Sequence, residues 1–424
     1  MKKILYLPIF LLVLLLPLVF LFSACGEERP LDQTSQSSGD PTPEPPKEPV
    51  VAQGLKYTVN GDKKTCTVTG IGECTEPYIV IPEQIDGYRV TAVGNAAFKN
   101  CAFLVSVTLP ESVESIGKNV FENCSALAEL VLPESLKSIG NGAFKGCSKM
   151  TEITIPASVT EIGKDIFYKA SSLSTVYYNA SYGSSSNDFM NTKSIIKIVF
   201  GGTSVPEYIC KKCENLKEVI IEDSVLTIGG GAFFLCTSLQ EVTVPDSVLT
   251  IGYGAFSFCE ALIDITLPAG LTEIADSMFQ SCSSLTDIKI PDSVTAIGME
   301  AFLGCSALSS VKLPEKLTRL DIGAFRECSS LTDITIPEGV EEIPYDAFKH
   351  CSLLTSIILP KELKTIGSWA FSHTSLKTLY FNGTEQQWRA VEKELGWNNA
   401  LRNYEVVFSS PKPEGGESDS VEIS

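Results

Sequence analysis

Apolar and polar residues follow one another in a pattern that returns every 23 residues over most of the chain. Each unit contains a stretch of the form Leu-x-x-Ile-x-Leu-Pro, in which the last apolar positions alternate with polar ones. Such alternation is typical of a short strand with one face turned inward, and the proline ends it because proline lacks an amide donor. A second apolar pair followed by glycine, as in residues 293–298, predicts another short extended piece. The remaining stretch, Ala-Phe-x-x-Cys, is too short for a full helix and predicts one helical or 3₁₀ turn.

One small residue in each unit, usually cysteine, serves as the anchor from which the repeat is counted. Phenylalanine stands three residues before every anchor but one, where Cys210 replaces it, and leucine stands three residues after most anchors. Neighbouring anchors are 23 residues apart except across one gap of 43 residues. The anchors are Cys101, Cys124, Cys147, Ala170, Cys213, Cys236, Cys259, Cys282, Cys305, Cys328, Cys351 and Thr374.

A single unit of this kind cannot bury its own apolar residues, whereas stacked units share a continuous core, as in solenoid proteins. Parallel strands stack about 4.8 Å apart, so the repeats and one irregular turn in the long gap would make a sheet roughly 60 Å long. We therefore predict a solenoid of about 12–13 turns with a cap at each end. One face should carry a parallel β-sheet, and the other should carry the short extended and helical or 3₁₀ turns.

The repeat resembles that of the BspA-type, or treponema-type, leucine-rich repeat family, whose unit reads Leu-x-x-Ile-x-Leu-Pro, then Ile-Gly, then Ala-Phe-x-x-Cys. The similarity covers about residues 79–382. The resemblance implies a leucine-rich-repeat solenoid on a bacterial surface. It also implies a role in adhesion, to host matrix or plasma proteins or to other bacteria. It implies no particular partner, because one scaffold presents many different surfaces.

The N-terminus has the character of an export signal. Lys2 and Lys3 precede an uncharged apolar run over residues 4–24, which two prolines interrupt and which ends in Phe-Ser-Ala before Cys25. This order is typical of a secretory signal, although the run is also long enough to span a bilayer as an uncleaved anchor helix. The ending resembles the lipobox of bacterial lipoproteins, with Phe22 where leucine is usual, and implies that Cys25 carries a lipid. Both alternatives predict an extracytoplasmic protein tethered to the bacterial membrane or cell surface.

Composition and pattern divide the chain into six segments. The stretches beside the folded body are rich in proline, serine and acidic residues and cannot bury a core. Near the C-terminus, Thr384 and Gln387 form a capping-box pair, and Trp388, Val391 and Leu395 follow at helical spacing. We predict a lipoprotein signal peptide (1–24), a disordered tether (25–50), an N-terminal β cap (51–82), the solenoid (83–382) with an irregular turn (179–200), a C-terminal helix–strand cap (383–408) and a disordered acidic tail (409–424).

Charge and composition exclude several classes of function. The chain has 51 acidic and 33 basic residues and a net charge of -18, which argues against binding to nucleic acid or anionic lipid. Cationic partners remain compatible with this charge. The chain has two histidines and no glycine-rich phosphate loop, so we predict neither an enzyme nor a cofactor. His350 and His373 each precede an anchor, and we interpret them as exposed loop residues rather than a weak metal site.

The cysteines occur in three contexts. Equivalent residues of stacked turns point the same way, so the anchor cysteines neither face each other for disulfides nor converge on zinc, and we interpret them as small buried side chains. Cys210 and Cys213 form a C-x-x-C pair without the strand–helix context of a redox motif. Cys66 and Cys74 lie outside the repeats, equidistant from Gly70. A hairpin turn at Gly70 would set them opposite each other for a disulfide, and two unpaired thiols are the alternative.

Two groups of residues are candidates for binding. Acidic residues recur at the fifth position after the anchor, where the strand pattern turns them outward: Glu218, Glu241, Asp264, Asp287 and Asp333. This row could receive a cationic segment of a partner, or cations, or form only a solvated face. The long gap contains the aromatic residues Tyr177, Tyr178, Tyr182 and Phe189, which could form an exposed contact patch or cover a kinked turn.

The functional hypothesis is reversible binding of a macromolecule along the exposed strand face. The first kind of partner is a protein of the host extracellular matrix or of a bacterial surface. The alternative is a polysaccharide, bound by a component of a nutrient-capture system. Rows of outward aromatic residues on the strands would favour the glycan, and the strands contain few.

Overall fold

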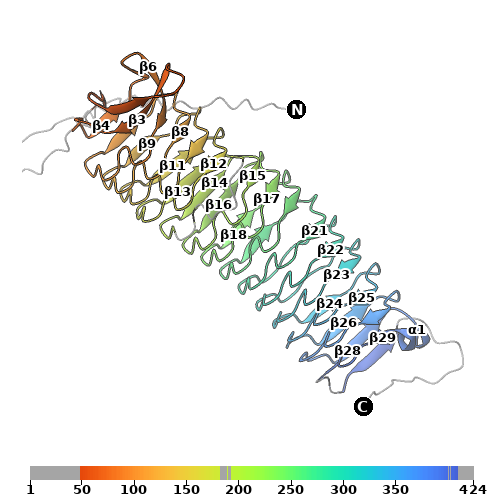
Figure 1. The fold of residues 1–424 in the computed structure, drawn as a ribbon. Coiled ribbons are helices and arrows are strands. Elements are labelled where there is room, and N and C mark those ends of the chain that lie inside the picture. The colour runs from red at the N-terminus through yellow and green to blue at the C-terminus, as the bar shows by residue number, and fades with distance from the viewer. Residues whose placement is uncertain (1–47, 182–188, 190–191, 400, 402, 409–424) are drawn as a thin grey trace, which may run out of the picture. The chain divides into compact units, whose positions relative to one another are not determined.

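The computed structural model describes residues 48–181, 189, 192–399, 401 and 403–408. Every described residue belongs to one compact unit, Lys47–Ser424. This unit is a parallel β-solenoid of about 14 turns (Figure 1), which confirms the predicted fold. It exceeds the predicted number of turns because a strand before the first anchor, Tyr78–Val80, already pairs with the sheet. The predicted signal peptide, Cys25, most of the predicted tether and the predicted acidic tail lie outside the described residues.

Two parallel sheets run along the unit. Most strands of the long-strand sheet come from the Leu-x-x-Ile-x-Leu stretches, whereas its first and last strands lie outside the repeats. The sheet consists of β1 (Val50–Val51), β4 (Tyr78–Val80), β7 (Ser106–Thr108), β9 (Glu129–Val131), β11 (Glu152–Ile155), β13 (Thr175–Tyr178), β14 (Lys197–Phe200), β16 (Glu218–Ile221), β18 (Glu241–Thr243), β20 (Asp264–Thr266), β24 (Asp333–Thr335), β26 (Ser356–Leu359), β28 (Thr378–Phe381) and β30 (Glu405–Phe408). The short-strand sheet comes from the apolar pairs and consists of β6 (Tyr88–Val93), β8 (Ser115–Ile116), β10 (Ser138–Ile139), β12 (Glu161–Ile162), β15 (Ser204–Val205), β17 (Thr227–Ile228), β19 (Thr250–Ile251), β21 (Glu273–Ile274), β22 (Ala296–Ile297), β23 (Arg319–Leu320), β25 (Glu342–Ile343), β27 (Thr365–Ile366) and β29 (Glu392–Lys393). Both sheets are interrupted in places, and within them equivalent residues of adjacent turns are partners, as in Glu241↔Asp264 and Ile274↔Ile297.

The third side of each turn is formed by the Ala-Phe-x-x-Cys stretch, which contains no helix in the described repeats. The predicted helical or 3₁₀ turn is therefore wrong. Alternate amides donate to the next turn, as from Phe121 to the Ala143 oxygen (2.8 Å), and others close turns within the unit, as from Cys124 to the Phe121 oxygen (3.0 Å). In this arrangement, residues such as Asn119 and Asn123 adopt the left-handed region (φ 55° and 61°). A helix would instead keep negative φ angles and pair each amide with a carbonyl oxygen of the same helix.

The core contains a ladder of phenylalanine rings, one from each repeat except the one in which Cys210 replaces the ring. Neighbouring rings such as Phe302 and Phe325 are stacked with their centroids 5.1 Å apart. Where Cys210 replaces the ring, Phe200 of β14 fills the space and contacts Phe233 edge-on at 6.0 Å. Each turn therefore supplies its neighbours with an apolar surface that it could not bury alone.

The long gap adds two of its aromatic residues, Tyr178 and Phe189, to the same core. Phe189 joins the ladder at 5.5 Å from Phe167, and Thr192, three residues later, is buried where the repeat has its anchor. Tyr178 and Phe189 are fully buried, so the predicted contact patch is wrong for these two residues. Tyr177 is 37% exposed, and Tyr182 lies outside the described residues.

The N-terminal end is covered by a small mixed arrangement in which β6 pairs in parallel with β3 (Thr65–Gly70). β2 (Lys56–Val59) and β3 form a hairpin, and β5 (Gln84–Ile85) pairs with β6. The hairpin turn lies at residues 60–64, not at Gly70, and Cys66 faces Val59 on one side and Val90 on the other. The predicted hairpin turn at Gly70 is therefore wrong, and with it the predicted Cys66–Cys74 disulfide. Both residues are buried free thiols.

The C-terminal end is covered by α1 (Glu385–Ala390) and β30. Thr384 and Gln387 form the capping box, and Trp388 is buried with its ring 5.3 Å from that of Phe381. The helix ends earlier than its predicted spacing, because Val391 is extended and leads into β29, which pairs with β27. Leu395 consequently lies beyond the helix and is 92% exposed.

Candidate functional site

The outer face of the long-strand sheet carries the acidic row predicted from the repeat. Glu218, Glu241, Asp264 and Asp333 are exposed first residues of β16, β18, β20 and β24, and Asp287 is exposed at the equivalent place of a turn without a strand. Charges one strand apart repel by about 0.9 kcal/mol in bulk water before screening by salt. The row is therefore a surface at which a cationic partner would relieve repulsion.

One member of the row is neutralised within the protein. The Lys197 ammonium of β14 lies 2.7 Å from the Glu218 carboxylate. The sequence pattern missed this pair because Lys197 belongs to the long gap, where the 23-residue spacing fails. Among the described residues, Glu241, Asp264, Asp287 and Asp333 form no ion pair, so these four remain open to a partner.

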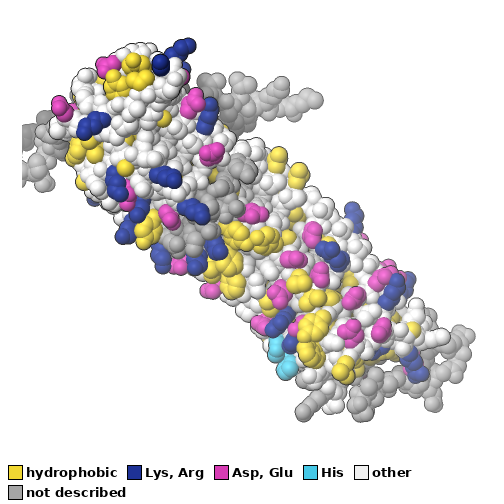
Figure 2. Space-filling model, viewed as in Figure 1, with side chains coloured by type: hydrophobic (Ala, Val, Ile, Leu, Met, Phe, Trp, Pro, Cys, Tyr) yellow, Lys and Arg dark blue, Asp and Glu magenta, His cyan; other side chains and the backbone are white. Residues whose placement is uncertain are grey.

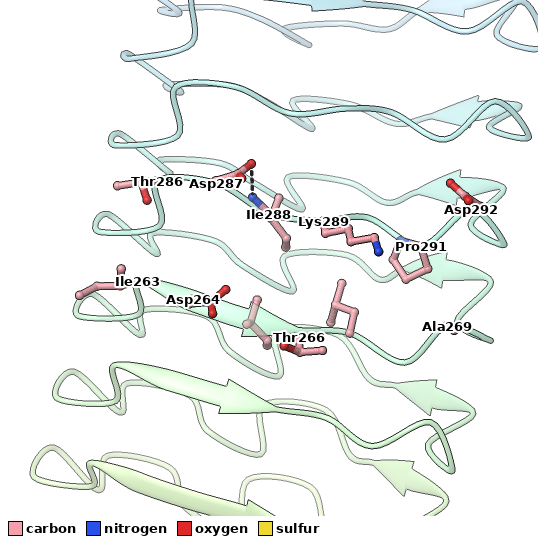
Figure 3. A pocket seen from close by; sticks show the side chains of 12 residues that line it. Ile263, Asp264, Thr266, Ala269, Thr286, Asp287, Ile288, Lys289, Pro291 and Asp292 are labelled. Carbon is pink, nitrogen blue, oxygen red and sulfur yellow. Dashed lines mark hydrogen bonds between the residues drawn. The ribbon is translucent and has the colours of Figure 1, made fainter.

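The long-strand sheet is interrupted in the middle of this row. Between β20 and β24, two successive turns contribute no strand, and only an isolated bridge joins Lys289 to Lys312. The Ile288 amide, which a regular strand would use in the ladder, donates to the Asp287 carboxylate at 2.8 Å. Figure 3 shows this turn running beside β20 without forming a strand.

A groove of about 500 Å³ lies at this interruption, between β20 and the next turn. Its lining includes the buried side chains of Ile265, Leu267 and Ile288 and the exposed side chains of Asp264 and Asp287. Figure 3 shows Asp264 on β20 and Asp287 and Ile288 on the next turn. The volume falls within the range of about 300–1,000 Å³ that is usual for ligand pockets. The acidic row therefore borders a cavity with an apolar floor.

Sequence reasoning did not find this groove, although the seventh position after the anchor contains a signal. Neighbouring turns with intact strands have threonine there, as in Thr243, Thr266 and Thr335, whereas the two interrupted turns have Lys289 and Lys312. Threonine favours strands more than lysine does, and two like charges directly opposite destabilise a pair of strands. Lysine in place of threonine therefore agrees with the interruption through its lower strand propensity. Repulsion between the two lysines does not open the ladder beside β20, because Lys289 and Lys312 face each other at the one bridge that persists.

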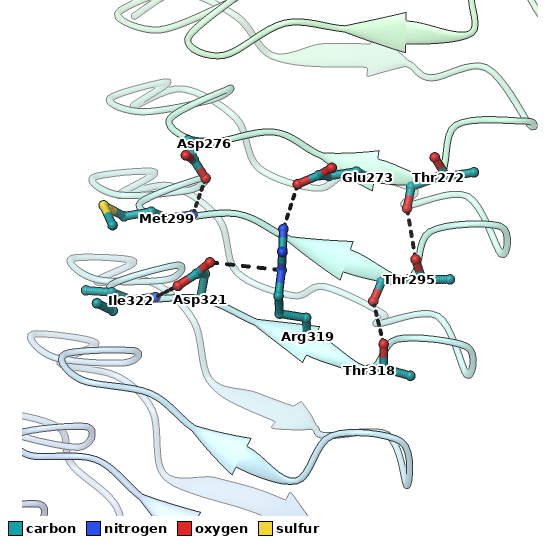
Figure 4. Close-up of polar contacts among 9 residues, drawn as sticks. All are labelled: Thr272, Glu273, Asp276, Thr295, Met299, Thr318, Arg319, Asp321 and Ile322. Carbon is teal, nitrogen blue, oxygen red and sulfur yellow. Dashed lines mark hydrogen bonds and ion pairs between the residues drawn. The ribbon is translucent and has the colours of Figure 1, made fainter.

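On the short-strand sheet, an ion pair links strands that lie two turns apart. Arg319 of β23 reaches across the intervening turn to Glu273 of β21, with 2.8 Å between the charged atoms (Figure 4). The Thr295 and Thr318 hydroxyls donate to the main-chain oxygens of Thr272 and Thr295.

A second exposed surface, the tyrosine bridge, lies on the Ala-Phe-x-x-Cys side. The hydroxyl oxygens of Tyr208 and Tyr253, two turns apart, lie 2.7 Å from each other, and this hydrogen bond raises the pKa of Tyr208 to about 12. Their rings cover Gly230 and Gly231 of the middle turn, where a Cβ atom would lie 2.6 and 2.2 Å from ring carbons. Tyr253 is 52% exposed, so the bridge presents aromatic and hydroxyl groups to solvent. The sequence analysis missed this pair, because it compared equivalent positions of the repeat and these two tyrosines lie two turns apart.

The anchor cysteines are buried thiols, as predicted, and they also join the turns by hydrogen bonds. The Cys305 thiol donates to the Phe279 oxygen of the preceding turn at 3.1 Å, and Cys328 does the same to Phe302 at 3.3 Å. Burial raises the pKa of the Cys259, Cys305 and Cys351 thiols from 9.0 to about 12. A thiol that stays protonated and enclosed is neither a nucleophile nor a metal ligand.

These thiols predict that the solenoid loses stability in alkali. An unfolded thiol ionises near pH 9.0, whereas the buried Cys305 thiol ionises near 12, so the stabilisation is complete below pH 9.0 and is lost as pH rises toward 12. Urea unfolding followed by circular dichroism should show the midpoint falling through this interval. In the double variant Cys305→Ala, Cys351→Ala, the urea midpoint should fall less over the same pH interval. An equal fall in the variant and the unchanged protein would show that ionisation of these thiols is not the cause.

The two histidines meet at the C-terminal part of the solenoid. The rings of His350 and His373 lie 4.6 Å apart, side by side in Figure 2, and the Ser372 hydroxyl lies 2.8 Å from Nδ1 of His373. Within the described ranges, no group of three histidine, cysteine, aspartate or glutamate residues is arranged to hold a metal ion.

The comparisons with known proteins agree with this architecture. The family model of the BspA type leucine rich repeat region matches residues 91–203, 203–298 and 272–390. The chain belongs to this family. A leucine-rich repeat protein from Bacteroides ovatus is 25% identical, with a TM-score of 0.55, and the match covers 85% of this chain and 99% of that chain. A leucine rich cell surface protein from Faecalibacterium prausnitzii is 29% identical over 81% of this chain and 97% of that chain, with a TM-score of 0.42. No curated protein matches the chain.

Membership in the BspA-type family supports an interaction role for the repeat scaffold. In this BspA-type protein, the acidic row combines four carboxylates that form no ion pair among the described residues with an adjoining groove. Within the part of the chain that the structure describes, no helix has the length and apolar character needed to cross a membrane.

Proposed function

We propose that this BspA-type protein is a lipid-anchored bacterial surface protein whose long-strand sheet binds another protein reversibly. The partner would be a protein of the host matrix or of a bacterial surface. The observation that carries the proposal is the acidic row, four of whose carboxylates are exposed and form no ion pair among the described residues. Such a row speeds association with a basic surface more than it strengthens the final complex.

The proposed attachment relies on the N-terminal sequence. Signal cleavage before Cys25 and lipid on its thiol would hold the solenoid outside the cytoplasm, with residues 25–50 as a tether and 409–424 as a free tail. Membership in the BspA-type family supports a place at the cell surface.

The test starts from the compact unit Lys47–Ser424, which lacks the predicted signal peptide and Cys25. It is screened on arrays of matrix proteins, bacterial surface proteins and glycans, and association rates are then measured for each protein that binds. The triple variant Glu241→Gln, Asp264→Asn, Asp333→Asn should associate about tenfold more slowly, and raising the salt should reduce the difference.

The matched control removes three exposed acids from the short-strand sheet: Glu161→Gln, Glu342→Gln and Glu392→Gln. It changes the net charge equally, so it should leave the association rate close to that of the unchanged unit. If both variants associate equally slowly, or if the row variant associates at the unchanged rate, the acidic row is not the binding surface.

A second candidate function is polysaccharide binding, and the tyrosine bridge is the observation that favours it. Exposed aromatic faces with neighbouring hydroxyl groups suit sugar rings, and Phe234 and Phe258 make a further ring pair at 5.6 Å on the same side of the solenoid. Signal on the glycan arrays alone would favour this function over protein binding.

A further inference from the structure

The groove beside β20 combines an open sheet edge with a cavity. β20 pairs with β18 on one side, where the Val244 amide donates to the Thr266 oxygen at 2.9 Å. On its other side, no backbone hydrogen bond joins residues 263–267 to residues 286–290, both of which the structure describes fully. An unpaired strand edge is a template for another extended chain, whose main chain supplies the missing partners.

The side chains of the groove define what such a chain should carry. The floor is apolar, made by Ile265, Leu267 and Ile288, so it favours an apolar side chain. Three carboxylates (Asp264, Asp287 and Asp292) and one ammonium (Lys289) line the groove, which favours a cation beside that apolar side chain.

The neighbouring surface limits the position of the cation. A second hollow, directly after the groove, is lined by Lys289, Lys312 and Lys316 with Asp292 and Glu315. A cationic side chain would be repelled there by the lysines, whereas toward Asp264 and Glu241 it meets acids without ion pairs. The complementary segment therefore places its cation on the β20 side.

We propose that this groove is the anchor site for an extended segment of a partner protein in which a lysine or arginine lies next to an apolar residue. The segment adds to the open edge of β20, inserts its apolar side chain above Ile265 and Ile288, and directs its cation toward Asp264. This inference rests on the proposed function and specifies the kind of segment that the long-strand sheet accepts.

The probe is an acetylated heptapeptide of alternating valine and threonine with a central arginine. It is added to the compact unit Lys47–Ser424, and amide hydrogen exchange is measured by mass spectrometry. Exchange should slow at residues 263–267 and 286–290. A peptide with glutamate in place of the arginine should bind about tenfold more weakly, because it meets the same carboxylates.

The decisive variant is Ala269→Trp, which fills the groove from an exposed lining position. Its matched control is Ala157→Trp, at the equivalent exposed position of the turn that contains β11, which pairs with β13 in an intact ladder. Ala269→Trp should weaken the arginine peptide at least about tenfold, and Ala157→Trp should leave it unchanged. Circular dichroism of both variants checks that the fold is retained.

Two results would overturn the proposal: equal binding by Ala269→Trp and the unchanged unit, or equal binding of the arginine and glutamate peptides. Its failure can be distinguished from failure of the proposed function. One outcome is a protein from the arrays that binds more weakly to the acidic-row variant and equally well to Ala269→Trp. This result would support the long-strand sheet as the binding face and rule out the groove as the anchor site. If the peptide slows amide exchange at β20 but no protein on the arrays binds, the groove proposal stands and the proposed function fails.

Discussion

Replacing Phe302 with alanine should lower the free energy of unfolding by about 3–5 kcal/mol, the largest single effect that we expect in this protein. The ring is fully buried and stacks between Phe279 at 5.4 Å and Phe325 at 5.1 Å. Its loss leaves a cavity that the two neighbouring turns cannot close, because main-chain hydrogen bonds fix their spacing. The Phe279 amide donates to the Ala301 oxygen (2.9 Å), and the Phe302 amide donates to the Ala324 oxygen (2.8 Å). Urea unfolding of the unit Lys47–Ser424, followed by circular dichroism, measures the change.

The matched control is Phe103→Ala, which removes the same ring from a position that is 42% exposed. It should change the free energy of unfolding by less than about 1 kcal/mol, because little apolar surface is uncovered. Hydrogen exchange should also show that Phe302→Ala loosens the turns on either side of it first, since repeats are stabilised by their nearest neighbours. Similar losses from the two variants would argue against a continuous phenylalanine core.

Replacing Gly140 with alanine should destabilise the solenoid by about 1–3 kcal/mol, although it adds only one methyl group. Gly140 follows β10 and stands directly over Gly117 of the preceding turn, to which it is held by a bond from its amide to the Ile116 oxygen (2.8 Å). A Cβ atom there would lie 2.5 Å from the Gly117 carbonyl carbon and 2.6 Å from the Lys118 nitrogen. The turns must therefore separate to admit it.

Gly270→Ala is the control, because nothing lies within 4 Å of the added carbon. It should be neutral or stabilise the protein by up to about 1 kcal/mol through a less flexible unfolded chain. Both variants are compared by their midpoints in urea. A neutral Gly140→Ala would show that the stack can expand locally without cost, contrary to close packing of backbone on backbone.

The candidate site was only partly predictable from single positions of the repeat. The outward direction of Glu241 and Asp264 followed from strand alternation, because the period of two assigns each residue to a face. Whether such a carboxylate stays unpaired depends on neighbours in other turns, and Lys197 reaches Glu218 from only 21 residues away, in a turn of irregular length. The groove could not be predicted from the apolar pattern, because residues 285–291 have the same apolar positions and proline as their paired neighbours and differ from them mainly at Lys289.

The sequence alone determined that units of one kind stack in parallel and in register, with phenylalanine, leucine and cysteine inside. The physical reason is that a constant period places each residue over its own equivalent, so an apolar position in one turn is apolar in all. Only the tertiary structure decided where the ladder opens after β20, which acids are neutralised, and how Phe189 and Phe200 complete the core. These outcomes depend on contacts between unlike positions of different turns, where side-chain size and charge decide how closely two backbones approach.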